Sequence, residues 1–201
     1  MTTKGLSMHR THLLNMLERY QILFTEDREI MSKIQKFVSG YKNCFERSCA
    51  PGHITGSAWI VDETKAFTLL THHKKLNKWL QLGGHADGDP DVYLVALREA
   101  QEESGLKNIH PLSEEIFEVD VHLIPDKTGG HYHYDVRFLF QADRSEKLIV
   151  SHESKELAWV ALDQLGDYTQ ERSVLRMKEK KPFQERLLTH NADSGSAQPI
   201  K

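Results

Sequence analysis

Residues 84–106, GHADGDPDVYLVALREAQEESGL, join a glycine-rich segment to an apolar run that ends in a group of glutamates. Asp89 or Asp91 can cap a helix here, and Pro90 suits a first helical turn. Gly105 can end the helix in the left-handed conformation. The pattern predicts a glycine-rich loop over residues 82–90 and a helix over residues 91–104.

Three glutamates of this helix lie close together. At about 100° per residue, Glu99, Glu102 and Glu103 fall on the arc that also carries the apolar residues of the preceding turns. Like charges at these spacings destabilise a helix by about 0.2–0.5 kcal/mol each, and only Arg98 offers compensation within the run. Carboxylates that continue an apolar stripe need a cation, and oxygen ligands suit Mg²⁺ or Mn²⁺.

The rest of the chain mixes helical and strand patterns. Residues 8–39 show two helical patterns with a polar break, and residues 171–188 predict a further helix. Strands are predicted at 57–62, 67–72, 116–124, 132–142 and 157–162, with a turn at 62–65 between the first two. This order predicts an α+β fold in which a curled mixed sheet carries helices on its faces.

The predicted domain organisation has three parts. Residues 1–50 form an N-terminal helical extension, residues 51–189 form the main domain with a C-terminal helix, and residues 190–201 have the composition of a disordered tail. The extension adds apolar surface, for which we expect burial against the main domain or in a homodimer.

Bulk properties exclude several function classes. The net charge of −3 argues against a nucleic-acid surface, which needs clustered cations. The sequence has no apolar run of about 18 residues and no signal peptide, so we expect no membrane segment and a cytoplasmic location. Cys44 and Cys49 are the only cysteines and indicate a reducing compartment. With His53 they form C-x4-C-x3-H, but two thiols without a metal are the favoured interpretation, since a fourth zinc ligand is missing.

Residues 84–106 resemble the Nudix box, G-x5-E-x7-R-E-U-x-E-E-x-G-U, where U is a bulky apolar residue. Pro90 replaces the first glutamate of that pattern, and Ala100 is small for its U position. The surroundings also resemble the family, with apolar segments at 67–70 and 79–82 and a Glu-x-x-Glu-x-x-Trp run that begins at Glu153. The matching residues are Gly84, Arg98, Glu99, Glu102, Glu103, Gly105 and Leu106.

The resemblance implies a Nudix-like α/β/α sandwich and metal-dependent hydrolysis of a pyrophosphate bond. The partner would be a small-molecule nucleoside diphosphate derivative, such as a nucleotide sugar, ADP-ribose or a nucleoside triphosphate. By the same resemblance Arg98 orients a glutamate, and Glu99 or Glu153 is the general base. The implied ligands of Mg²⁺ or Mn²⁺ are Gly84, through its carbonyl, and Glu99, Glu102 and Glu103.

A histidine-rich strand offers a second group of site residues. Strand alternation in HYHYDVRF, residues 131–138, places His131, His133, Asp135 and Arg137 on one face. This face is either exposed to solvent or a wall of the substrate site, on which Arg137 binds phosphate and His133 contacts the substrate. His85, directly after Gly84, is the third predicted substrate contact.

Two alternative functions share the same motif. A Nudix-fold module that binds a nucleotide without turnover is one, and the intact carboxylates argue against it. Isopentenyl diphosphate isomerase is the other, and its chemistry uses a cysteine in an active-site strand. Neither Cys44 nor Cys49 lies in a predicted strand of the main domain.

Overall fold

The computed structural model describes residues 8–125 and 129–180. Its α-helices are α1 (Met8–Leu23), α2 (Arg28–Gly40), α3 (Val92–Ser104), α4 (Leu165–Tyr168) and α5 (Arg172–Glu179), with short 3-10 helices at Thr25–Asp27 and Leu162–Gln164. Its strands are β1 (Gly52–Val61), β2 (Phe67–His73), β3 (Lys78–Leu80), β4 (Leu82–His85), β5 (Ile109–Pro111), β6 (Glu118–Ile124), β7 (His131–Ala142) and β8 (Ser154–Ala161). The predicted tail, and residues 181–188 of the predicted last helix, lie outside the described residues.

All eight strands belong to one mixed, open sheet. Strand β1 lies at its centre and is buried along its whole length. It pairs in parallel with β7, from Gly52 opposite Tyr132 to Val61 opposite Gln141. The other pairings are antiparallel: β2 and β4 share the second edge of β1, β5 and β6 share the second edge of β7, and β3 and β8 flank β2.

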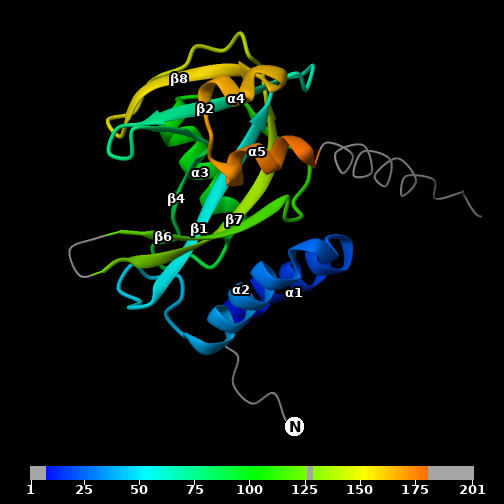
Figure 1. Cartoon of the computed structure of the whole chain (residues 1–201), viewed down its shortest axis with the longest axis vertical. Coiled ribbons are helices and arrows are strands. Elements are labelled where there is room, and N and C mark those ends of the chain that lie inside the picture. The colour runs from blue at the N-terminus through cyan, green and yellow to red at the C-terminus, as the bar shows by residue number, and fades with distance from the viewer. Residues whose placement is uncertain (1–7, 126–128, 181–201) are drawn as a thin grey trace, which may run out of the picture.

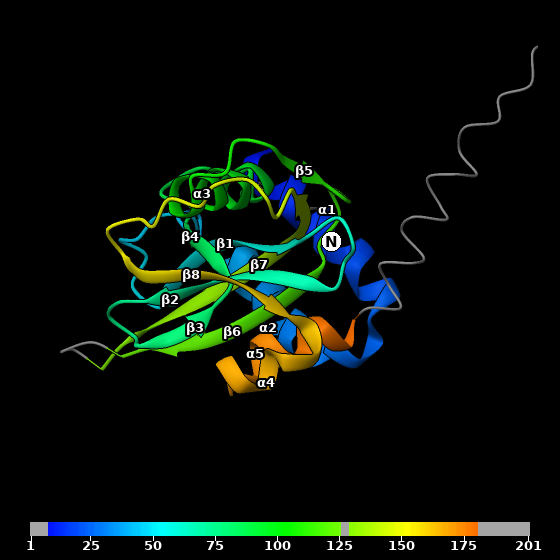
Figure 2. The same cartoon turned by 90° about the horizontal axis from the view of Figure 1, so that it is seen from above.

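Helices cover both faces of this sheet. Helix α3 packs on β1 and β4 on one face, and α4 and α5 lie on the opposite face (Figures 1 and 2). Helix α2 packs against β6, and its Phe37 stacks on Tyr134 of β7, with ring centroids 3.9 Å apart. The predicted α+β sandwich with N-terminal helices is therefore confirmed. The homodimer stays a prediction, although Ile22 and Leu23 at the end of α1 are exposed apolar residues.

Five residues, which we call the interface cluster, join the N-terminal helices to the rest of the fold: Tyr20, Asp27, Glu118, Arg176 and Lys180. Arg176 donates to Asp27 (2.6 Å) and to Glu118 (2.8 Å). Lys180 Nζ lies 2.8 Å from Asp27 and 3.1 Å from Glu118. Two buried carboxylates thus receive two cations, so this cluster balances its own charge.

The glycine-rich segment before α3 differs from the prediction. It contains a strand, β4, rather than only a loop, with Gly84 opposite Gly56 and His85 opposite Thr55 on β1. Glycine has low strand propensity, so these residues carry no local strand signal, and pairing with β1 overrides that propensity. A Cβ atom at Gly84 would overlap the carboxylate of Glu99, which explains why glycine suits this position. Strands β3 and β5 were also not predicted, and each is only three residues long.

Candidate active site

A cavity of about 850 Å³ opens where α3, β4 and the histidine-rich end of β7 meet. This volume suits a nucleotide-sized ligand. The cavity wall includes all but one of the predicted site residues, which come from four separate segments of the chain. These are Gly84, His85, Arg98, Glu99, Glu102, Glu103, His133 and Glu153.

Helix α3 positions the carboxylates, and its ends form as the sequence predicts. Asp91 is the N-cap and accepts a hydrogen bond from the Leu94 backbone N–H (3.1 Å). At the other end Gly105 has φ of +72°, and its N–H donates to the carbonyl of Gln101 (2.8 Å). Both caps set the length of the helix, so that its last turn lies beside Gly83 and Gly84.

Glu103 is the most deeply buried of the box carboxylates, with 8% of its surface exposed. It accepts a hydrogen bond from the Gly83 backbone N–H (3.1 Å). Burial raises the pKa of Glu103 to about 8, and the neighbouring charges of Glu99 and Glu153 add to this rise. No cationic side chain in the described part of the chain pairs with Glu103.

Glu99 lies beside it and has one local partner, Arg98. Arg98 donates to Glu99 (3.2 Å) and to the carbonyl of His85 (3.4 Å). Burial nevertheless raises the pKa of Glu99, against the lowering by Arg98. Arg98 also lies 3.8 Å from Asp89, so the carboxylate next to Pro90 contacts the same guanidinium.

Glu102 does not lie on the buried arc of α3 where the helical projection placed it. Its side chain is 65% exposed, whereas that of Glu99 is 19% exposed. The buried stripe of α3 runs through Val95, Ala96 and Ala100 to Glu103, and places Glu102 at the rim of the cavity. Projection on a helical wheel did not resolve this difference, because the sheet covers a narrower arc than the one that contains the three glutamates.

The donor set at this end of the cavity suits a hard divalent cation. Glu103 is buried and pairs with no cationic side chain of the described residues, Glu99 is partly buried with Arg98 as its partner, and Glu102 is at the rim. Gly84 brings backbone close to Glu99. Buried carboxylates that lack a countercharge are unfavourable, and Mg²⁺ or Mn²⁺ takes such oxygen ligands. The residues present therefore fit the metal that the box implies.

Comparison with known proteins agrees with this geometry. The NUDIX domain model matches residues 53–181. The chain belongs to the NUDIX family. Its class is thus that of the Nudix pyrophosphohydrolases. No curated protein matches the chain as a whole or in part.

Solved Nudix-fold structures resemble the chain at low sequence identity. A C. elegans Ap4A hydrolase binary complex superposes with a TM-score of 0.55 at 18% identity, covering 68% of this chain and 98% of that one. The E. coli dihydroneopterin triphosphate pyrophosphohydrolase gives 0.51 at 11% identity, covering 64% and 93%. At these identities the likeness supports the fold.

Arg137 does not line the Nudix cavity, although the sequence placed it on the substrate wall. Its side chain is only 1% exposed. Its guanidinium donates to Asp135 (2.7 Å), to the Ser173 carbonyl (2.6 Å) and to Asp120 (3.4 Å). Strand alternation gave the correct face, but α5 covers the far end of that face, and all three nitrogens are occupied. Arg137 is therefore corrected from a phosphate contact to a buried structural residue.

The other polar residues of β7 do face the cavity. His131, His133 and Asp135 line it together with His85 of β4. Asp135 accepts hydrogen bonds from Thr55 (2.9 Å) and from Ser57 on β1 (2.8 Å). The first half of this strand thus reaches the cavity, and its contact with a substrate stays a prediction.

Arg47 and Lys75 at the cavity were not predicted as site residues, and His53 was considered only together with the two cysteines. Arg47 pairs with Asp87 at the cavity wall, and Lys75 lies in the turn between β2 and β3. His53, on buried β1, packs against the histidines of the wall. No local signal placed Lys75 at the cavity, because strand β3, which completes this hairpin, was not predicted.

The cysteines lie elsewhere. Cys44 and Cys49 are both free and buried, and neither lines the cavity. Burial raises the pKa of the Cys44 thiol to about 11, so it stays protonated at neutral pH. The isomerase alternative needs a cysteine at the reacting carbon, and no such group lines the described part of this Nudix cavity.

Within residues 8–125 and 129–180, no helix has the length and apolar character to span a bilayer.

Proposed function

We propose that this Nudix protein hydrolyses a pyrophosphate bond in a nucleoside diphosphate-linked substrate, and that it uses Mg²⁺ or Mn²⁺. The observation that carries the proposal is Glu103, a buried carboxylate with no cationic partner among the described residues, next to the partly buried Glu99 at the wall of a cavity of about 850 Å³. A polyanionic substrate enters such a site only with cations, because the carboxylates would otherwise repel it.

Glu99, Glu102 and Glu103 would hold the metal, with the carbonyl of Gly84. When bound, the metal supplies Lewis-acid neutralisation of the pyrophosphate oxygens. The Gly83 N–H keeps the Glu103 carboxylate in place, and Arg98 does the same for Glu99.

Glu153 is the proposed general base, with Glu99 as the alternative from the box. Glu153 lines the cavity on the segment before β8, and its side chain is 53% exposed, so water reaches it. Glu99 is hydrogen-bonded to Arg98 and would also hold the metal, so its oxygens are less free to take a proton. Glu153 would take a proton from the attacking water. The water oxygen then bonds to phosphorus as the bridging P–O bond breaks.

The remaining wall would bind the substrate around that bond. Lys75 and Arg47 supply positive charge at the wall for phosphate oxygens, and His85 and His133 offer imidazole contacts. The names of the two similar structures, an Ap4A hydrolase and a dihydroneopterin triphosphate pyrophosphohydrolase, support a nucleotide-like diphosphate as the substrate class.

A substrate panel tests the proposal. ADP-ribose, nucleotide sugars, dinucleoside polyphosphates and nucleoside triphosphates are incubated with Mg²⁺ and, separately, with Mn²⁺, and products are identified by mass. We expect at least one class to release a nucleoside monophosphate or diphosphate fragment. Glu103→Gln serves as the blank, and a product that forms equally with this variant would refute the assignment of the site.

The general base is tested by measuring two quantities for each variant, kcat and the dependence of the rate on metal concentration. Glu153→Gln should lower kcat by about 100-fold or more and leave the metal dependence unchanged. Glu99→Gln should change both. If Glu153→Gln retains full kcat, Glu153 is not the base.

A nucleotide-binding module without turnover is the alternative of a different class. It predicts that members of the panel bind, as measured by calorimetry, and remain intact after prolonged incubation. Glu103, which is buried without a cationic partner among the described residues, favours the hydrolase, since a binding module needs no such arrangement.

A further inference from the structure

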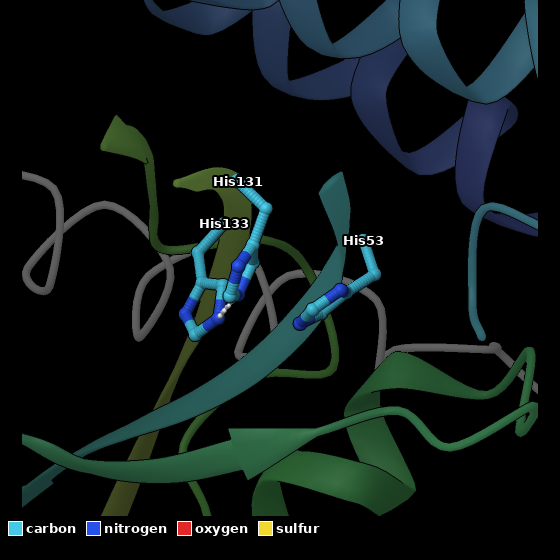
Figure 3. Close-up of side chains that lie close together, drawn as sticks. All are labelled: His53, His131 and His133. Carbon is cyan, nitrogen blue, oxygen red and sulfur yellow. Dashed lines mark hydrogen bonds between the residues drawn. The ribbon is translucent and has the colours of Figure 1, made fainter. Parts of the chain in front are cut away.

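Four histidines gather in a part of the site that the box carboxylates do not use. His53 of β1 lies opposite His133 of β7 in the parallel pairing, and His131 lies two residues earlier on the same face. The ring centroids of His53 lie 4.8 Å from His133 and 4.9 Å from His131. His85 of β4 packs against both His53 and His133. Figure 3 shows the rings of His53, His131 and His133 turned toward one another.

The nitrogen atoms of three of these rings have the spacing of metal ligands. One nitrogen each from His53, His131 and His133 lies within 4.8 Å of the other two. The Nε2 atoms of His131 and His133 are 3.3 Å apart. Two nitrogens at about 2.0–2.1 Å from a tetrahedral ion are roughly 3.4 Å apart, so this pair already has the ligand separation.

His53 supplies an independent sign that a ligand belongs here. Only 3% of His53 is exposed, and neither of its ring nitrogens has a hydrogen-bond partner among the described residues. A buried polar group without a partner is costly, and most such groups in proteins are satisfied. An ion bound between His53 and the two β7 histidines would satisfy one of these nitrogens.

The ligand chemistry differs from that of the carboxylates. Neutral imidazole suits Zn²⁺, Co²⁺, Ni²⁺ and Cu²⁺, whereas Mg²⁺ prefers oxygen ligands. Burial, followed by the neighbouring histidines, lowers the pKa of His53 to about 4, so this ring is neutral at pH 7. His131 and His133 line the cavity and His53 lies behind them, so an ion on all three would face the cavity with one position open.

We propose that His53, His131 and His133 form a binding site for a borderline divalent ion of the Zn²⁺ type, separate from the carboxylate site of the Nudix box. The cysteines that precede His53 in the sequence take no part. His53 is thus the one residue that the proposed site shares with the C-x4-C-x3-H pattern, and its other two ligands would come from β7.

Zinc retention by the untagged full chain tests this site. The protein is stripped with a chelator, loaded with Zn²⁺, passed through gel filtration and analysed by mass spectrometry of the elements. We expect about one Zn²⁺ per chain for the wild type. His131→Gln and His133→Gln should each weaken zinc binding at least about tenfold. His110→Gln changes an exposed histidine of β5 and should bind as the wild type does.

Glu103→Gln separates the two metal sites. We expect this variant to retain Zn²⁺ like the wild type, because its carboxylate is not part of the histidine group. Zinc loss in Glu103→Gln equal to that in His133→Gln would overturn the proposal, as would a wild type that retains no zinc or a His133→Gln variant that binds normally.

A measurement on the wild type guards against variants that fail to fold. Imidazole nitrogen resonances of the stripped protein are recorded by NMR during a Zn²⁺ titration. We expect the signals of His53, His131 and His133 to change together at one equivalent, with those of exposed His110 and His152 unchanged. Changes confined to exposed histidines would mean adventitious binding and would overturn the proposal.

Discussion

Glu103 and Glu118 are two buried glutamates with opposite surroundings. Glu118, on β6, receives Arg176 at 2.8 Å and Lys180 at 3.1 Å. Glu103, on α3, receives only the Gly83 N–H within residues 8–125 and 129–180. Burial raises the pKa of both carboxyls; Lys180 and Arg176 offset this at Glu118, whereas Glu99 and Glu153 add to it at Glu103. The interface cluster carries its own countercharge, and the cavity leaves that charge to a ligand.

This contrast separates two uses of the same residue type. A fully paired buried cluster contributes to the unique packing of the fold, and loss of one partner is costly. A buried group without its countercharge costs stability in the free protein and marks a binding site. We therefore expect variants at Glu103 to affect turnover and variants in the interface cluster to affect stability.

The largest expected effect is on turnover. Glu103→Gln should lower metal-dependent turnover of the identified substrate by about 100-fold or more, because it removes a ligand of the proposed metal. Glu118→Gln should leave turnover unchanged at temperatures where the variant is folded. Initial rates with saturating Mg²⁺ measure both. A similar loss in the two variants would remove the distinction between the clusters.

The next effect is on stability. Arg176→Met should lower the free energy of unfolding by about 3 kcal/mol, since it leaves Asp27 and Glu118 with one cation between them. Arg172→Met is the matched control on the same helix, with a side chain that is 79% exposed, and should change stability by about 0.5 kcal/mol or less. Urea unfolding measures both variants, and equal stabilities would contradict the structural role of the cluster.

The stability of the metal-free protein should depend on pH through Glu103. The pKa of Glu103 is 4.5 in the unfolded reference and about 8 in the fold. Because folding raises it, the contribution of the protonated carboxyl is complete below pH 4.5 and is lost as pH rises through about 8. The free energy of unfolding should fall by a few kcal/mol over this range, and Glu103→Gln should reduce that slope.

The measurement is urea unfolding in the presence of a chelator at several pH values between those two pKa values. Addition of Mg²⁺ should restore stability at the alkaline end, because ionised Glu103 then has a countercharge. If the free energy of unfolding changes with pH equally in the wild type and in Glu103→Gln, then ionisation of Glu103 does not destabilise the fold.

The smallest effect concerns the cavity wall. Lys75→Ala should raise KM for the diphosphate substrate by about two- to fivefold with kcat unchanged, as expected for an exposed charge contact. Lys36→Ala changes an exposed lysine on α2 and should leave KM unchanged. Steady-state kinetics at low and high salt measure both, and a salt-independent KM in the wild type would exclude the charge contact.

The site was predictable to the extent that its residues are close in sequence. The caps Asp91 and Gly105 follow from local spacing, as does the position of Glu103 on the buried stripe of α3, and the structure places them as expected. The predicted roles of Glu153 and His85 stay proposals, but both residues reach the same cavity. Glu102 and Arg137 show the limit of such patterns, because their exposure depends on which neighbouring element covers them.

By itself, the sequence determined the α3 helix, its box and the NUDIX family, because helix caps, side-chain periodicity and motif spacing are local properties. Only the tertiary structure decided which charges are compensated. Among the described residues, no cationic side chain pairs with Glu103. In the fold, Arg176 and Lys180 lie next to Glu118, and His53 lies beside His131 and His133. Those contacts join segments distant in the chain, and a parallel strand register or a helix packed on a sheet leaves no local signal of its partners.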